Sequence, residues 1–103
     1  MQTKRTLAGS SYRKALGALE TGRAEDAVHH LRQTVTLDPE HANAWNDLGV
    51  LMEALGNHHE ARRCYEAALR VNPDMFEAQS NLSLLSNCME MARWARHQVA
   101  LSF

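Results

Sequence analysis

Apolar residues recur at helical spacing along most of the chain. One such stripe, in the segment 58–71, consists of Ala61, Cys64, Tyr65, Ala68 and Leu69. Positions three and four apart share a face of an α-helix, whereas no segment shows the sustained alternation of apolar and polar residues that marks a β-strand. The pattern predicts six helices, and their expected ranges are 8–21, 24–37, 42–55, 58–71, 76–89 and 91–102.

The same residue types return at a regular interval of about 34 residues. Gly22 and Gly56 are separated by this interval, and so are Pro39 and Pro73. Glycine supplies the left-handed backbone that closes a helix and proline cannot continue one, so both residue types mark helix ends. Two ladders of small residues run through three units and consist of Ala15, Gly49 and Ser83 and of Ala27, Ala61 and Ala95. Because small residues let paired helices approach closely, the repeat predicts antiparallel hairpins.

The central unit carries a recognisable set of residues, namely Trp45, Leu48, Gly49, Gly56, Ala61, Tyr65, Ala68 and Pro73. With these it resembles the tetratricopeptide repeat family, whose unit is a helix-turn-helix of about 34 residues. The first unit keeps Ala15, Gly22, Ala27, Leu31 and Pro39 but has Ser11 and Lys14 where the signature has Trp and Leu. The third unit keeps Ala78, Leu82 and Ala95 but has Glu90 in place of the turn glycine and Gln79 in place of the tryptophan.

The resemblance implies an all-α fold, an α-α superhelix of three stacked antiparallel hairpins. The expected organisation is a single domain over residues 1–103, with repeat units at about 8–41, 42–75 and 76–103 and an N-terminal tail at 1–7. The family geometry also implies that the first helix of each unit lines a concave groove.

Composition excludes several classes of function. The formal net charge is -1, which provides no positive field for nucleic acid or for an anionic membrane. No apolar run near the N-terminus resembles a signal-peptide core, and the two cysteines, Cys64 and Cys88, are too few for a disulfide framework. A cytoplasmic protein without nucleic-acid or membrane partners is expected.

By the family geometry, the groove is expected to be lined by Tyr12, Arg13, Leu16, Leu19, Asn46, Asp47, Val50, Glu53, Glu77, Asn81, Leu84 and Asn87. Leu16, Val50 and Leu84 occupy equivalent positions and form an apolar row, while the charged residues around them are mainly acidic. We therefore expect a protein-binding adaptor or scaffold whose partner is a peptide or protein segment with aliphatic anchors and basic residues.

The resemblance also allows one kind of partner to be excluded. Family members that capture the acidic C-terminal tails of heat-shock chaperones use a clamp of Lys, Asn and Arg on the concave helices. The corresponding positions here are Tyr12, Leu16, Asp47, Glu77 and Asn81, which lack basic residues. Like charges would repel an acidic tail, so the sequence predicts that such tails are not bound.

Histidine and cysteine can bind metal ions or act as nucleophiles, but their positions in this sequence support neither role. The pairs His29-His30 and His58-His59 are adjacent, so their side chains diverge on a helix and cannot share one ion. No phosphate loop or nucleophile motif occurs, and neither cysteine has an evident activating partner. The sequence predicts a protein without catalytic, metal or cofactor sites.

Two alternatives remain open at the sequence level. The apolar residues near the C-terminus would promote self-association, and they are Met91, Trp94, Leu101 and Phe103. A homo-oligomeric structural unit is therefore one alternative. The other is a helical-repeat scaffold belonging to a larger enzyme, such as a transferase.

Overall fold

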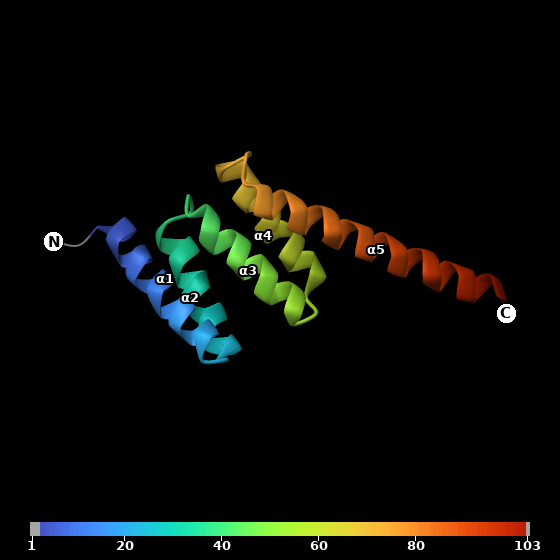
Figure 1. Ribbon diagram of the computed structural model, residues 1–103, viewed down its shortest axis with the longest axis horizontal. Helices are drawn as coiled ribbons and strands as arrows, with labels where there is room; N and C mark the ends of the chain where they lie inside the picture. Colours follow the sequence, from blue (N-terminus) through green and yellow to red (C-terminus); the bar gives the residue numbers. More distant parts are fainter. Residues whose placement is uncertain (1–2, 103) are drawn as a thin grey trace.

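A computed structural model describes the backbone of residues 3–102 and the side chains of residues 3–98. The elements are α1 (Lys4–Glu20), α2 (Ala24–Leu37), α3 (Ala42–Ala54), α4 (His58–Val71) and α5 (Phe76–Ser102). α1 pairs with α2 and α3 with α4, while α2 packs on α3 and α4 packs on α5 (Figure 1). The described chain is thus a stack of helical hairpins, which confirms the expected all-α hairpin-repeat fold.

Glycine closes both hairpins. Gly22 has φ of 72° and Gly56 has φ of 85°, in the left-handed region that residues with a Cβ rarely adopt. At the second turn the N–H of Gly56 donates to the carbonyl of Glu53 at 3.0 Å, and the N–H of Asn57 donates to Met52 at 2.8 Å. These bonds satisfy the last carbonyls of α3. The expected glycine stops are therefore confirmed.

The third unit does not form a hairpin. α5 is a single helix of 27 residues, whereas the repeat predicts two helices at 76–89 and 91–102. The position equivalent to Gly56 is Glu90, a good helix former whose side chain disfavours the left-handed turn. The helix therefore continues and projects beyond α4 (Figure 1). The expectations of six helices and a closed third hairpin are wrong for this reason.

The N-terminal helix is longer than the sequence predicts. α1 begins at Lys4, so four residues of the expected tail, 4–7, belong to the helix. Thr3 caps the helix, because its side-chain oxygen accepts a hydrogen bond from the N–H of Thr6 at 3.2 Å. The expected tail at 1–7 is thus wrong for its helical part.

The hydrophobic core lies between the paired helices. Its largest fully buried side chains are Tyr65, Leu31, Leu48, Leu85 and Thr34. In the first two units both small-residue ladders are buried, at Ala15, Gly49, Ala27 and Ala61. Their third members, Ser83 and Ala95, are exposed because no second helix of the third unit covers them.

The loops between units repeat as closely as the helices. Trp45 Nε1 donates to the carbonyl of Pro39 at 2.8 Å, and Gln79 Nε2 donates to the carbonyl of Pro73 at 2.6 Å. Gln79 stands one repeat after Trp45, where the family signature has tryptophan. It therefore replaces the aromatic ring but keeps the hydrogen bond, and the start of α5 is positioned as the start of α3 is.

Candidate functional site

Polar side chains connect the first helices of successive units. The phenol of Tyr12 on α1 donates to Asp47 Oδ2 on α3 at 2.6 Å. Asn81 Nδ2 on α5 donates to Asn46 Oδ1 on α3 at 3.1 Å. These bonds place residues of three consecutive units on one surface, which we call the α1–α3–α5 face.

An aliphatic row runs beside these hydrogen bonds. Leu16 follows Tyr12 by four residues, Val50 follows Asp47 by three and Leu84 follows Asn81 by three, so each lies on the same face of its helix. Their exposed fractions are 37% for Leu16, 46% for Val50 and 61% for Leu84. The row is therefore accessible in all three units and becomes more so towards α5.

The acidic residues of this face differ in whether they accept hydrogen bonds from the protein and in how exposed they are. Asp47 accepts the hydrogen bond from Tyr12, and Glu53 Oε1 accepts one from the phenol of Tyr65 at 2.8 Å. Both carboxylates are half-buried, whereas Glu77 is exposed. Asp47 and Glu53 therefore help to hold the fold, whereas Glu77 is an exposed acidic residue of this face.

The pKa of Tyr12 depends on charges from more than one helix of this face. The pKa of the Tyr12 phenol is raised well above its ordinary value, first by burial and then by the hydrogen bond to Asp47. The negative charges of Asp47 and Glu77 raise this pKa further. Residues from α1, α3 and α5 therefore share one electrostatic environment.

The remaining expected groove residues fall into two groups. Arg13, Leu19 and Asn87 are exposed on α1 and α5. Asn46 is only 3% exposed and is engaged by Asn81, so it supports the face from below and does not line it. The expectation that Asn46 offers its side chain to a partner is wrong, because the neighbouring repeat covers it.

Sequence reasoning missed one neighbour of this face. The ring of His41 lies 4.5 Å from the ring of Tyr12, centroid to centroid, at an interplanar angle of 49°. His41 also caps α3, since its Nδ1 accepts a hydrogen bond from the N–H of Ala44 at 3.1 Å. The near-repeat spacing between Tyr12 and Asp47 is the sequence signal that could have located the contact between units.

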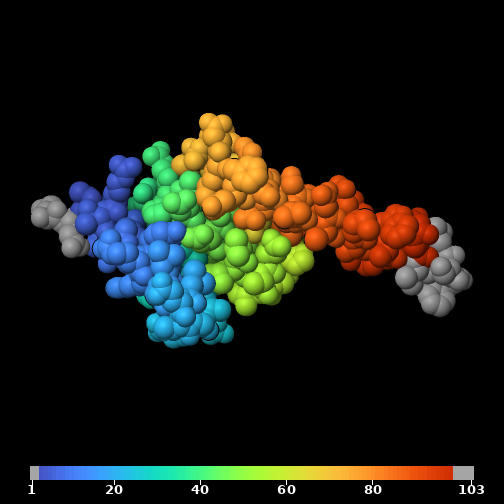
Figure 2. Space-filling model, viewed as in Figure 1, coloured from blue at the N-terminus to red at the C-terminus, as the bar shows by residue number. Residues whose placement is uncertain are grey.

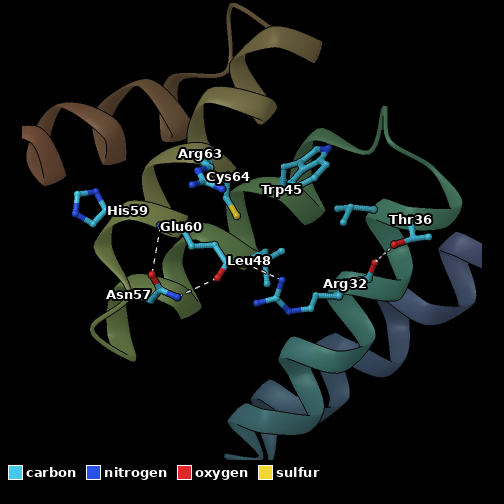
Figure 3. Close-up of a pocket in the computed structure, with 10 residues that line it drawn as sticks. Arg32, Thr36, Trp45, Leu48, Asn57, His59, Glu60, Arg63 and Cys64 are labelled. Carbon is cyan, nitrogen blue, oxygen red and sulfur yellow. Dashed lines mark hydrogen bonds and ion pairs between the residues drawn. The ribbon is translucent and has the colours of Figure 1, made fainter.

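A separate hollow lies between α2, α3 and α4, with a volume of about 660 Å³. Its lining residues are Arg32, Val35, Thr36, Trp45, Leu48, Asn57, His59, Glu60, Arg63 and Cys64 (Figure 3). Glu60 is held from both sides, because Arg32 Nη1 lies 2.6 Å from Oε1 and Asn57 Nδ2 donates to Oε2 at 3.0 Å. These contacts tie α2 to α4 and occupy the carboxylate of the hollow.

Cys64 in this hollow is a poor nucleophile. The residue is 3% exposed, and burial, assisted by the charge of Glu60, raises the pKa of its thiol to about 11. The thiol is therefore protonated at neutral pH, although the thiolate is the reactive form. Among the described residues no three His, Cys, Asp or Glu side chains are grouped so that they could hold a metal ion.

In the part of the chain that the structure describes, no helix has the length and apolar character needed to cross a bilayer.

Comparison with known proteins agrees with this architecture. A sequence relative is the tetratricopeptide repeat-containing protein trd-1 of Caenorhabditis elegans, 32% identical over 81 residues. Another is the protein O-mannosyl-transferase TMTC1 of Mus musculus, 35% identical over 66 residues. The matches cover 77% and 64% of this chain but only 10% and 7% of those relatives.

A solved structure with a similar fold is the first tetratricopeptide repeat domain of Spaghetti (RPAP3), bound to the HSP90 peptide SRMEEVD. Its TM-score is 0.75 at 23% sequence identity, over 81% of this chain and 66% of that one. The family model of the tetratricopeptide repeat matches residues 18–87, more than half of the chain. Domains of this family are generally protein-interaction modules. The chain belongs to the tetratricopeptide repeat family.

Proposed function

We propose that the α1–α3–α5 face binds a segment of another polypeptide, and that the chain acts as an adaptor or scaffold. The observation that carries this proposal is the row of Leu16, Val50 and Leu84, which stays exposed at equivalent positions beside hydrogen bonds that hold the three helices together. An accessible apolar row on a rigid support offers anchor contacts at little cost in ordering. This supports binding more strongly than any single exposed residue does.

The charges around the row favour a basic partner. Glu77 is exposed, Asp47 and Glu53 each keep one carboxylate oxygen outside the hydrogen bonds described above, and Arg13 is the nearby basic residue. A segment with aliphatic side chains and adjacent Lys or Arg would match both the row and its charge.

The same charges argue against an acidic chaperone tail. The structural neighbour was solved with the peptide SRMEEVD, which contains two glutamates and an aspartate. In this chain Asp47 and Glu77 occupy the α1–α3–α5 face, and Tyr12 is engaged by Asp47. Like charges would oppose such a peptide, so it serves as a negative control.

Binding is tested with three labelled peptides and fluorescence anisotropy. The first alternates leucine with lysine, the second replaces lysine by glutamate, and the third is SRMEEVD. We expect the first to bind, and expect Val50→Asp and Leu84→Asp to weaken it at least tenfold. Val71→Asp is the matched control, because Val71 is 38% exposed but lies at the end of α4. Equal losses in all three variants, or no binding of the first peptide, would reject the proposal.

The charge preference is tested separately. Glu77→Lys should weaken the basic peptide and flatten the dependence of its affinity on salt, because one attractive pair becomes repulsive. Glu66→Lys introduces the same charge change on α4, where Glu66 pairs with Arg62 on the exposed surface. Identical salt dependence in the two variants would show that charge on the α1–α3–α5 face does not select the partner.

Self-association is a second candidate function. It is favoured by Met91 and Trp94 on α5, which are 63% and 59% exposed. Leu101 and Phe103, also expected to take part, have side chains outside the described residues. A role as the scaffold part of a larger enzyme is suggested by the name of the transferase relative, of which the match covers 7%.

A further inference from the structure

The second half of α5 has no counterpart in the rest of the fold. Residues 91–102, here called the α5 arm, project beyond α4 (Figure 1). Every residue from Glu90 to Gln98 is exposed, including Met91 and Trp94. A helix of this kind leaves large apolar side chains in water, which favours burial against another surface.

The arm keeps the sequence register of a second repeat helix. In the closed hairpin of α3 and α4, a Cβ placed on Gly49 would lie 2.6 Å from Cε1 of Tyr65, so these two positions are in direct contact. The equivalent positions in the third unit are Ser83 and Val99. Ser83 is larger than the glycine at position 49, and Val99 is smaller than the tyrosine at position 65. A larger residue at the first position and a smaller one at the second would fit the same space between two paired helices.

Ser83 and Val99 cannot meet within one chain. Both belong to α5, and at about 1.5 Å rise per residue a continuous helix places them about 24 Å apart. A second copy of the chain can supply the missing contact, because its arm has the same sequence and its own uncovered first half.

We infer that two copies of this chain exchange their α5 arms. Residues 91–102 of each copy pack antiparallel on residues 76–89 of the other, and the third hairpin is thereby completed twice. The arrangement has two-fold symmetry, since each copy gives and receives the same helix. It resembles a domain swap in which the hinge at Glu90 is an unbroken helix.

Charge complementarity favours a second copy of the chain as the partner of the arm, and an antiparallel orientation of the two α5 helices. Residues 76–90 contain Glu77 and Glu90 and no Lys or Arg, whereas residues 91–102 contain Arg93 and Arg96 and no Asp or Glu. In the register that pairs Ser83 with Val99, position 90 of one copy lies beside position 92 of the other, so the antiparallel arrangement brings Glu90 close to Arg93 of the second copy. Glu77 lies too far along the helix to meet either arginine and stays available to a partner. A parallel arrangement would instead bring like charges together.

The repeat register also indicates where Trp94 would lie. Trp94 is the equivalent of Glu60 in the preceding unit, and Glu60 contacts Arg32 on the first hairpin. The equivalent of Arg32 on α4 is Glu66, so Trp94 of the second copy would lie against α4 near Glu66. Leu84 would remain accessible, as its equivalents are in the closed hairpins, so the exchange is independent of the proposed partner binding.

The unmodified 103-residue chain gives the first test. Sedimentation equilibrium over a range of micromolar concentrations should show a species of twice the 11.6 kDa chain mass. The fluorescence of Trp94 and its accessibility to iodide should change with dimer formation, while Trp45 provides a constant background. A chain that remains monomeric at high concentration would overturn the inference.

A cysteine pair tests the antiparallel register. The variant Ser83→Cys/Val99→Cys is made with Cys88→Ser, so that the exposed native thiol is removed. In a redox buffer, exchange predicts a disulfide-linked dimer on a non-reducing gel. A monomer with an internal disulfide would show that the hairpin closes within one chain, and no disulfide would show that the positions do not meet. Either result would overturn the inference.

The control for this pair is Ser83→Cys/Arg93→Cys in the same background. It keeps the same number of thiols but moves one of them along the arm, away from the register that the α3–α4 hairpin defines. We expect this variant to stay unlinked. Equal linking in both variants would mean random collision and would count against exchange.

The hinge is tested by restoring the turn. Glu90→Gly/Met91→Asn recreates the Gly56-Asn57 sequence that closes the second hairpin, and should convert the dimer into a monomer. His97→Gly weakens the same helix without restoring a turn at position 90 and leaves Arg93 and Arg96 in place, so the dimer should persist. An unchanged dimer in the first variant, or equal loss in both, would contradict the role of position 90.

Discussion

The phenol of Tyr12 donates a 2.6 Å hydrogen bond to Asp47 across the boundary between two repeats. One repeat later Asn81 donates to Asn46 at 3.1 Å. Tyr12 and Asn46 occupy equivalent positions, and so do Asp47 and Asn81. The same two places are therefore joined at each boundary, with different donors, and each bond orients the first helix of the next unit.

Replacing Tyr12 by phenylalanine removes the donor and leaves a half-buried carboxylate oxygen of Asp47 without it. We expect the free energy of unfolding to fall by about 1 kcal/mol, at the lower end for a bond to a charged group because the site is partly solvated. Urea denaturation measures the change. In Tyr12→Phe/Asp47→Asn the second substitution should cost less than it does alone. Fully additive losses would contradict the coupling.

Stability should decline in alkaline solution. Burial and hydrogen bonds to Asp47 and Glu53 raise the pKa values of Tyr12 and Tyr65 above the ordinary 10.0. A raised pKa stabilises the fold fully below pH 10.0, and this contribution is lost as the pH rises towards the folded-state pKa. The free energy of unfolding should therefore fall above about pH 10. In Tyr12→Phe the free energy of unfolding should fall less steeply with pH. An equal dependence on pH in both proteins would show that Tyr12 does not contribute.

Two glycines in helices should respond in opposite directions to alanine. A Cβ on Gly49 would lie 2.6 Å from the ring of Tyr65, so Gly49→Ala should destabilise the chain by about 1–3 kcal/mol. A Cβ on Gly17 meets nothing within 4 Å, and alanine there should stabilise α1 by about 0.5–1 kcal/mol. Thermal denaturation compares the two variants. If both shifts had the same sign, the close packing of α3 on α4 would be in doubt.

The hydrogen bond from Gln79 to Pro73 can be separated from the size of the side chain. Gln79→Leu keeps much of the volume but removes the donor, and should lower the free energy of unfolding by about 0.5–1.5 kcal/mol. Gln79→Trp restores the residue found at position 45 and its N–H, so it should be better tolerated. Chemical denaturation of the two variants decides, and a more stable Leu variant would be inconsistent with this view.

Much of the fold could be predicted from local sequence features, namely the turn glycines and the small residues that repeat between units. Gly22 and Gly56 stand where the backbone needs positive φ, and the small-residue ladders lie where paired helices touch. The third unit differs because Glu90 replaces the glycine that would have stopped α5. The departure from the repeat was visible in the sequence, but its outcome depended on whether packing of the arm could outweigh the preference of Glu90 for a helix.

The candidate site was predicted less completely. The row of Leu16, Val50 and Leu84 is exposed as expected, since periodicity alone places it on one face. Asn46 was misjudged, because its burial arises from a neighbour in the next repeat, Asn81. Helical periodicity describes one helix at a time and does not include contacts between units. That these residues form a binding site remains a prediction.

Because α5 is unbroken, the length of the molecule and the stability of its first two hairpins depend on different parts of the chain. The described chain extends 65 Å along its longest axis and 29 Å and 18 Å along the others, and the projecting helix accounts for much of this elongation (Figure 2). Glu90 is exposed and is not part of the hydrophobic core. A single substitution there could therefore change how far the molecule reaches and how fast it tumbles, while the melting of the first two hairpins stays the same.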